Sequence, residues 1–157
     1  MENISNRYKV LFVCLGNICR SPAAQGIFEH IIRENGMTDR ISADSAGLYG
    51  GHAGQHPDRR MRTAALYRGY GLSHSARQVR SYDFNDFDMI VAMDDQNYED
   101  LMHLAPSVEA THKIRRMADL VTALTAFCFS GNDRCRKAGY SLMRSSTSWS
   151  MNRSCCS

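Results

Sequence analysis

The chain has 157 residues, of which 43% are hydrophobic and 22% charged, values typical of one globular domain. Its formal net charge of +3 is unevenly placed: residues 134–157 carry five basic side chains and no acidic one, which leaves 14 basic against 16 acidic side chains in residues 1–133. With neither a signal-peptide pattern nor an apolar run of membrane-spanning length, the sequence favours a cytoplasmic protein with no nucleic-acid or membrane partner.

The predicted elements alternate between strands and helices. In chain order they are a strand over 9–13, a helix over 23–34, a strand over 41–46, a glycine-rich loop over 47–57, a helix over 59–70, a strand over 87–93, a helix over 94–104 and a strand over 113–116. The apolar face of the first helix holds Ile27, Phe28, Ile31 and Ile32, and Gly71 ends the second helix. The alternation predicts an α/β fold: a single-domain, doubly wound sheet of about four parallel strands with helices on both faces.

Residues 14–22, which join the first strand to the first helix, read Cys-Leu-Gly-Asn-Ile-Cys-Arg-Ser-Pro. A strand that turns into a helix points backbone N–H groups and the positive end of the helix dipole into one cup, which binds an anion. These groups and the charge of Arg20 stabilise a nucleophilic thiolate on Cys14, while the Arg20 guanidinium can donate to two phosphate oxygens. We therefore predict that Cys14 and Arg20 are catalytic and act on a phosphate monoester. The alternative is a buried cysteine that ends a core strand.

The rest of the loop fits the same interpretation. Glycine at position 16 permits positive φ, and the short amide of Asn17 can bond the loop to itself. Ser21 is predicted as the helix N-cap with its hydroxyl facing the sulfur, and Pro22 as the first helical residue. The residues predicted to bind the phosphate are Leu15, Gly16, Asn17, Ile18, Cys19 and Ser21.

This loop, with Ala23-Ala24-Gln25-Gly26-Ile27-Phe28 after it, resembles the phosphate loop and first helix of the low molecular weight protein tyrosine phosphatases. Further matches are Ser45-Ala46-Gly47, Gly54 with Pro57-Asp58, Gly71-Leu72 with His74, Ala76 and Arg77, and Asp88-Met89-Ile90-Val91-Ala92-Met93-Asp94. The resemblance covers about residues 8–119, and we expect residues 1–119 to be the body of a phosphatase domain. It implies a flavodoxin-like, phosphotyrosine phosphatase I-like fold.

The activity implied by this resemblance is hydrolysis of phosphotyrosine in proteins, and of small aryl phosphates, through a cysteinyl-phosphate intermediate. We expect a monomer without a cofactor. We also expect no metal, because the six histidines show no paired ligand spacing and Cys14 with Cys19 lacks partners for zinc.

Two residues outside the loop are candidates for holding it in place. The resemblance implies that Ser45 hydrogen-bonds Asn17, and a serine at a strand end also bonds readily to nearby backbone. His74 is a candidate for a similar role, with a packed or surface histidine as the alternative. Asp94 follows a strand and begins a helix, so an N-cap explains it without catalysis.

The rim of the pocket is expected to set substrate choice. In the resembling family an aromatic residue in the loop after the second strand stacks on the phosphotyrosine ring, and alignment on Gly54 places Gly51 at that position. Tyr49, two residues earlier, is the candidate substitute, or an exposed tyrosine without that role.

The C-terminal segment, residues 120–157, departs from the family. An Asp-Pro-Tyr element supplies the family's general acid, whereas here only Asp133 lies near the right distance from Cys14 and no proline follows it. Seven of the 17 residues 141–157 are serines, which cannot form the amphipathic helix expected there. We therefore expect an atypical tail, out of frame or disordered, and hypothesise a change of reading frame between Leu120 and Gly131. The alternative is a natural divergent tail.

Two other functions compete with an active phosphatase. The first is a phosphate-binding or phosphotyrosine-binding module that keeps Cys14 and Arg20 but turns over poorly for want of an acid. The second is an arsenate reductase, which shares the Cys-x-x-Asn-x-x-Arg-Ser pattern and adds two downstream redox cysteines, for which Cys128 and Cys135 are the available residues.

Overall fold

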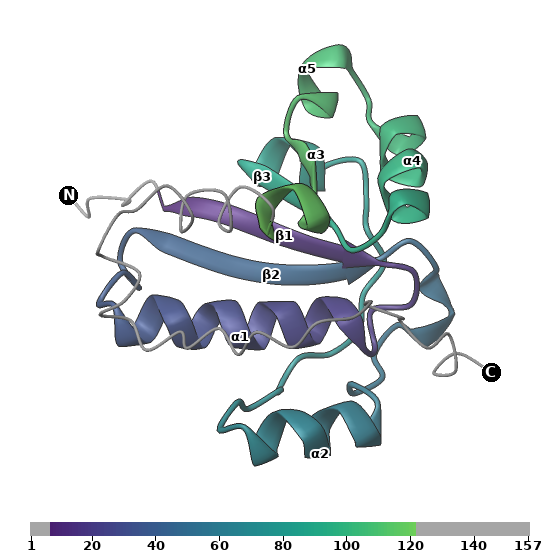
Figure 1. The fold of residues 1–157 in the computed structure, drawn as a ribbon. Helices are drawn as coiled ribbons and strands as arrows, with labels where there is room; N and C mark the ends of the chain where they lie inside the picture. Colours follow the sequence, from purple (N-terminus) through teal and green to yellow (C-terminus); the bar gives the residue numbers. More distant parts are fainter. Residues whose placement is uncertain (1–6, 122–157) are drawn as a thin grey trace, which may run out of the picture. The chain divides into compact units, whose positions relative to one another are not determined.

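A computed structural model describes residues 7–121 of the chain (Figure 1). Its sheet has the order β2-β1-β3-β4, and every neighbouring pair is parallel. The strands are β1 (Tyr8–Cys14), β2 (Ile41–Gly47), β3 (Met89–Ala92) and β4 (Ile114–Arg116). The helices are α1 (Arg20–Glu34), η1 (Gly50–His52), α2 (Arg59–Tyr67), α3 (Asp83–Asp86), α4 (Asp95–Leu104) and α5 (Val108–Thr111).

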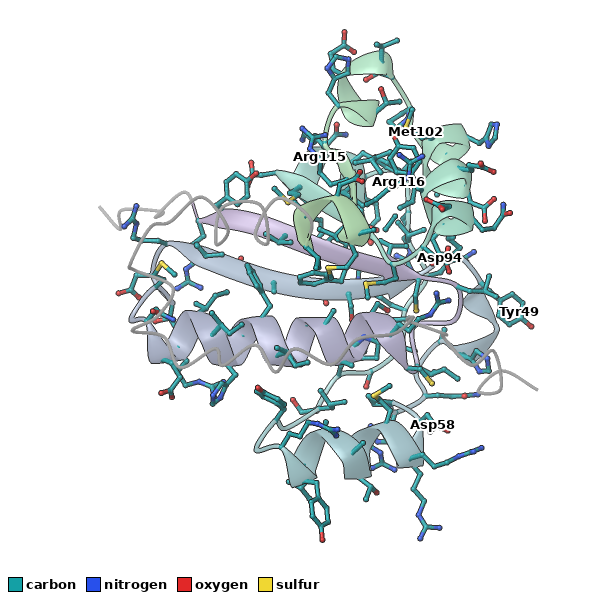
Figure 2. All side chains as sticks on the ribbon, in the orientation of Figure 1. Tyr49, Asp58, Asp94, Met102, Arg115 and Arg116 are labelled. Carbon is teal, nitrogen blue, oxygen red and sulfur yellow. The ribbon has the colours of Figure 1, made fainter. Side chains whose placement is uncertain are left out.

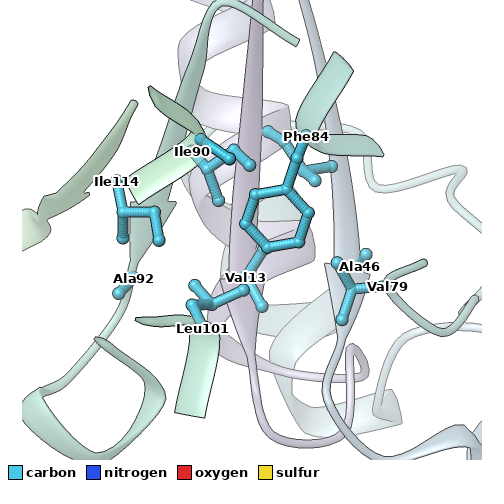
Figure 3. Close-up of a cluster of buried hydrophobic side chains, with 10 residues drawn as sticks. Val13, Ala46, Val79, Phe84, Ile90, Ala92, Leu101 and Ile114 are labelled. Atoms are coloured by element: carbon cyan, nitrogen blue, oxygen red, sulfur yellow. The ribbon is translucent and has the colours of Figure 1, made fainter. Parts of the chain in front are cut away.

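Helices cover both faces of the sheet, because the side chains of β1 alternate between two apolar clusters. Val13 faces a cluster with Phe84 of α3 and Leu101 of α4, which Figure 3 shows around the central strand. Phe12 points the other way and meets Phe28 of α1, with the two ring centroids 5.5 Å apart. The prediction of a doubly wound α/β sheet of four parallel strands is therefore confirmed.

Helix α1 presents a different face to the sheet from the one predicted. Ile32 is buried and Phe28 is half-buried, but Ile27 and Ile31 are about 40% exposed. Ala24, Phe28 and Ile32 follow one another at four-residue intervals and form the covered stripe, whereas Ile27 and Ile31 lie on its flank. The prediction that all four apolar residues face the core is wrong for these two isoleucines.

Helix α2 ends three residues before the predicted position. Gly69 takes the left-handed conformation with φ +83°, so it is this glycine, and not Gly71, that ends the helix. The N–H of Tyr70 donates to the carbonyl of Ala65 and that of Gly69 to the carbonyl of Leu66, both at 2.9 Å. This pair of bonds is the Schellman motif, which satisfies the last carbonyls of the helix.

The other differences lie at element ends. The third strand is shorter than predicted, and the short helices η1, α3 and α5 were not predicted. Asp94 is the N-cap of α4, as expected, and accepts a hydrogen bond from the N–H of Asn97 at 2.7 Å. Within residues 7–121, no helix is long and apolar enough to cross a membrane. The predicted division into residues 1–119 and 120–157 stays a prediction, because almost all of the second segment lies outside the described residues.

Candidate active site

The loop of residues 15–19 lies at the carboxyl edge of the sheet, between the last residue of β1 and the first turn of α1. Neighbouring segments hold it from outside: the N–H of Tyr49 donates to the carbonyl of Leu15 at 2.8 Å, and the N–H of Asp58 to that of Ile18 at 2.7 Å. Gly47 stands opposite Cys14 on β2, and a Cβ there would lie 2.9 Å from the Leu15 carbonyl oxygen. Only glycine therefore lets β2 approach the loop this closely.

The sulfur of Cys14 receives two polar contacts at the floor of this loop. The backbone N–H of Asn17 donates to Sγ at 3.3 Å, and the Oγ of Ser21 lies 3.0 Å from Sγ. The Ser21 oxygen accepts a bond from the Asn17 side-chain amide at 2.9 Å, and its own proton can be donated to the sulfur or to the Ala46 carbonyl at 3.4 Å. The Cys14 sulfur therefore lies within hydrogen-bond distance of one backbone N–H and one hydroxyl.

The first turn of α1 differs from the prediction in one respect. The helix begins at Arg20 with Cys19 as N-cap, and that cap makes no side-chain hydrogen bond. Ser21 is therefore not the N-cap, and Pro22 is the third helical residue rather than the first. The Ser21 hydroxyl still faces the sulfur, because it lies in the first turn directly above the end of β1.

Asn17 is the centre of the hydrogen-bond network behind the loop. It is fully buried and has φ +55°, a left-handed conformation that asparagine tolerates better than most residues. Its Nδ2 donates to Ser21 Oγ and, at 3.0 Å, to Ser45 Oγ. Its Oδ1 accepts from the backbone N–H of Arg77 at 2.9 Å and from His74 Nε2 at 2.6 Å. All four bonds of the amide are therefore used to fix the loop.

Ser45 and His74 complete this network from β2 and from the segment before α3. The bond from the Arg77 N–H identifies the Asn17 atom that faces His74 as the amide oxygen. An amide oxygen can only accept, so His74 is the donor and carries its proton on Nε2. Burial lowers the pKa of His74; the charge of Asp44 opposes that effect and the charge of Arg77 adds to it. Ser45 accepts from Asn17 and donates its own proton to Gln25 Oε1 at 2.7 Å.

The segment that carries His74 is held by the side chain of Arg77. Its guanidinium donates to Asp44 at 2.8 and 3.0 Å and to the buried carboxylate of Asp83 at 3.0 Å. Burial alone would lower the pKa of Arg77, but the hydrogen bonds to Asp83 and Asp44 outweigh it, so this pKa is raised. Arg77 thus ties β2 and α3 to the backbone N–H that orients Asn17.

Arg20 forms an ion pair with Asp94, through its Nη1 and the carboxylate Oδ2. Both side chains remain about 40% exposed, so the guanidinium is within reach of solvent. The Asp94 side chain thereby has two roles. It caps α4, and it holds Arg20 at the edge of the sheet where β1 ends.

The rim beside the loop carries Tyr49, which is 58% exposed and lies at the edge of the molecule in Figure 2. Its ring meets that of His52 edge to face, with centroids 5.8 Å apart. A Cβ at Gly51 would lie 2.3 Å from the Tyr49 ring, so the ring occupies the space that a side chain at position 51 would need. A Cβ at Gly16 would lie 3.1 Å from the His52 ring, which places these two aromatic side chains beside the phosphate loop.

Three of the residues predicted from the sequence belong to the C-terminal segment. Asp133, Cys128 and Cys135 lie outside the described residues, so their predicted roles stay predictions. Among residues 7–121 no group of three His, Cys, Asp or Glu side chains is arranged to hold a metal ion.

The sequence predicted no role for Gln25, Asp44, Arg77 or Asp83. It also did not predict the ion pair between Arg20 and Asp94. The signal for Arg77 was present, because it belongs to one of the motifs that carry the family resemblance. The carboxylates it contacts, Asp44 and Asp83, gave no comparable signal.

The comparisons with known proteins agree with this geometry. A family model described as low molecular weight phosphotyrosine protein phosphatase matches residues 9–127. The chain is 44% identical over 115 residues to a low molecular weight protein-tyrosine-phosphatase of Bacillus subtilis, a match that covers 71% of this chain and 72% of the relative.

The chain is also similar to solved structures of phosphatases. A protein tyrosine phosphatase of Entamoeba histolytica with Hepes in its active site is 45% identical, with 71% of each chain covered and a TM-score of 0.69. A Drosophila arginine phosphatase is 38% identical, with 69% of each chain covered and a TM-score of 0.64.

Proposed function

The chain belongs to the low molecular weight phosphotyrosine protein phosphatase family, and we propose that its Cys14 hydrolyses protein phosphotyrosine and small aryl phosphates through a cysteinyl-phosphate intermediate. The observation that carries this proposal is the position of the Cys14 sulfur, which meets the N–H of Asn17 and the hydroxyl of Ser21 at the floor of an anion-binding loop. The network behind Asn17 holds these donors in place before any substrate arrives.

In the first step the Cys14 thiolate attacks phosphorus, an S–P bond forms, and the bond from phosphorus to the phenolic oxygen breaks. The backbone N–H groups of residues 15–20 and the Arg20 guanidinium bind the non-bridging oxygens, on which negative charge is concentrated in the transition state. In the second step water attacks phosphorus, the S–P bond breaks and inorganic phosphate forms. The Ser21 hydroxyl stabilises the thiolate as it leaves.

Arg20→Lys is expected to lower kcat/KM for aryl phosphates and to weaken inhibition by inorganic phosphate, each by about 10- to 30-fold. A lysine keeps the charge but donates from one point, so it cannot bond Asp94 and two phosphate oxygens together. The loss corresponds to about one charge-assisted hydrogen bond, roughly 1.5–2 kcal/mol. Arg33→Lys, the same change in the last turn of α1, is the control and should leave both values unchanged. Equal activity of Arg20→Lys and parent would contradict this role.

Tyr49 is proposed as the aromatic residue that stacks on the substrate phenol. The support for this role is its ring position over Gly51, where a side chain would otherwise project, and its contact with His52. In this proposal the missing side chain at Gly51 leaves the space that the Tyr49 ring needs to stack on the substrate.

Asp133 is the proposed general acid, and it lies outside the described residues. If it protonates the phenolic oxygen, Asp133→Asn slows cleavage of phosphotyrosine by about 10²-fold but barely slows nitrophenyl phosphate, whose phenolate leaves unaided. Steady-state rates on both substrates test this. No effect on either, combined with a flat dependence of the parent's rate on leaving-group pKa, would mean that another acid is present.

The chain is proposed to leave the family's own C-terminal sequence between Leu120 and Gly131, a range that contains residue 127, where the family-model match ends. The support is the serine-rich composition of residues 141–157 and the lack of an Asp-Pro-Tyr element. Sequencing the source gene from independent isolates tests the proposed frame change between Leu120 and Gly131. An uninterrupted frame that encodes this same tail would overturn it. We further propose a cytoplasmic, monomeric enzyme whose substrates are tyrosine-phosphorylated proteins or small aryl phosphates.

The test of function is release of inorganic phosphate from matched peptides that carry phosphotyrosine, phosphoserine or phosphoarginine. We expect repeated turnover of the phosphotyrosine peptide and of nitrophenyl phosphate. One equivalent of phosphoenzyme without further turnover would instead support a binding module. A preference for phosphoarginine, the activity after which the Drosophila neighbour is named, would refute phosphotyrosine as the substrate. Arsenate turnover coupled to thioredoxin oxidation would support a reductase.

A further inference from the structure

Helix α2 carries an exposed basic surface formed by Arg59, Arg60 and Arg62, with Arg68 after the helix end. No acidic residue occurs from position 59 to position 82. The nearest carboxylate in the chain, Asp58, is already used as the N-cap, since it accepts from the N–H groups of Arg60 and Met61 at 2.9 and 3.2 Å. Among the described residues, no ion pair involves Arg59, Arg60 or Arg62.

The stability of the helix does not explain these three arginines. They lie in the N-terminal half of α2, where the positive end of the helix dipole disfavours cations. Arg59 and Arg62 are also three positions apart, so their like charges repel. Arg68 behaves differently, because at the other end of the helix its guanidinium donates to the Ala64 carbonyl at 3.1 Å and the dipole favours it. Helix stability therefore accounts for an arginine at position 68 but not for the arginines at positions 59, 60 and 62.

The basic end of α2 is the end that touches the phosphate loop. The N–H of Asp58 donates to the carbonyl of Ile18 at 2.7 Å, so the first turn of the helix begins directly beside the loop. In Figure 2, Asp58 lies at the same edge of the fold as Tyr49 and Asp94. At 1.5 Å per residue, Arg68 lies about 13 Å farther along the helix axis than Arg59.

We propose that Arg59, Arg60 and Arg62 bind acidic residues that flank the phosphotyrosine of a substrate protein. The inference rests on the proposed function, since it takes the phosphate loop as the place where the phosphotyrosine binds. A peptide anchored there crosses the segments that surround the loop, and the start of α2 is one of these, because the N–H of its N-cap Asp58 bonds the Ile18 carbonyl. Carboxylates on the departing chain complement three guanidinium groups that have no carboxylate partner among the described residues.

The experiment compares kcat/KM for two phosphotyrosine peptides that differ only in their flanks, three Asp or Glu residues in one and Asn or Gln in the other. We expect the parent to prefer the acidic peptide about tenfold at low ionic strength, because each exposed ion pair changes binding by about 1.5- to 5-fold. The preference should fall toward unity in 0.5 M salt, which screens exposed charges.

The matched variants separate the surface from the pocket. Arg59→Gln, Arg60→Gln and Arg62→Gln combined should abolish the preference and leave kcat/KM for nitrophenyl phosphate, which has no flanks, unchanged. Arg68→Gln is the control and should keep the preference. The triple variant removes charges that oppose the helix dipole and repel one another, so we expect it to be no less stable than the parent in urea unfolding.

The outcomes distinguish this inference from the function on which it rests. If the parent hydrolyses both peptides equally well, the inference is wrong and the proposed function stands. If the parent hydrolyses neither peptide nor nitrophenyl phosphate, the proposed function fails and the inference fails with it. Inhibition by a short RNA that the triple variant abolishes, without any peptide preference, would assign the surface to nucleic acid instead.

Discussion

Replacing Cys14 by serine is expected to reduce hydrolysis of nitrophenyl phosphate by about 10⁴-fold or more, the order seen when a covalent nucleophile is removed. A serine hydroxyl is not ionised at neutral pH, and neither of the two donors that face the sulfur can take its proton. The same donors remain available for an anion, so the affinity for phosphate or vanadate should change by only a few-fold.

Two measurements separate loss of the nucleophile from loss of the fold. The serine hydroxyl can use the contacts that the sulfur makes with Asn17 and Ser21, so the free energy of unfolding should change by no more than about 1 kcal/mol. A rapid quench with labelled substrate should trap phosphate on Cys14 in the parent and none on the variant. More than a trace of turnover by Cys14→Ser would rule out a cysteinyl-phosphate intermediate.

The sheet and the phosphate loop could be predicted because their signals are local. The buried strand β1 is a continuous apolar run, and residues 14–22 hold the whole strand-loop-helix transition within nine positions. The face of α1 is less well determined by sequence. The apolar pattern includes Ile27 and Ile31, and periodicity alone does not reveal which stripe of a broad apolar face meets the sheet.

Contacts between distant segments could not be read from the sequence. Arg77 meets Asp44 across 33 positions and Arg20 meets Asp94 across 74, and both pairs depend on how the crossovers place the strands. Asp94 shows the limit most clearly, since its N-cap role has a local pattern whereas its pairing with Arg20 has none. The end of α2 was misplaced because two glycines lie two positions apart, and only the backbone reveals that Gly69 takes the positive φ.

Asn17→Ala is expected to lower kcat/KM by about 10³-fold, because it removes the amide that holds the loop's donors toward the phosphate, and losing one such donor alone costs about 10²–10³-fold. It should also destabilise the protein by about 2–5 kcal/mol. The alanine leaves the half-buried N–H of Arg77 and the Nε2–H of His74 without their acceptor, and it must adopt a φ of +55°.

Asn17→Gly separates the two causes, because glycine adopts positive φ without strain but supplies no amide. It should unfold at a higher urea concentration than Asn17→Ala, by about 1 kcal/mol of unfolding free energy, while its kcat/KM stays as low as that of the alanine variant. Urea unfolding and nitrophenyl phosphate kinetics on both proteins test this. Activity restored in the glycine variant would mean that the left-handed turn alone forms the loop. Equal stability of the two variants would mean that the strain at position 17 is relieved elsewhere, and only the hydrogen bonds would then explain why asparagine stands there.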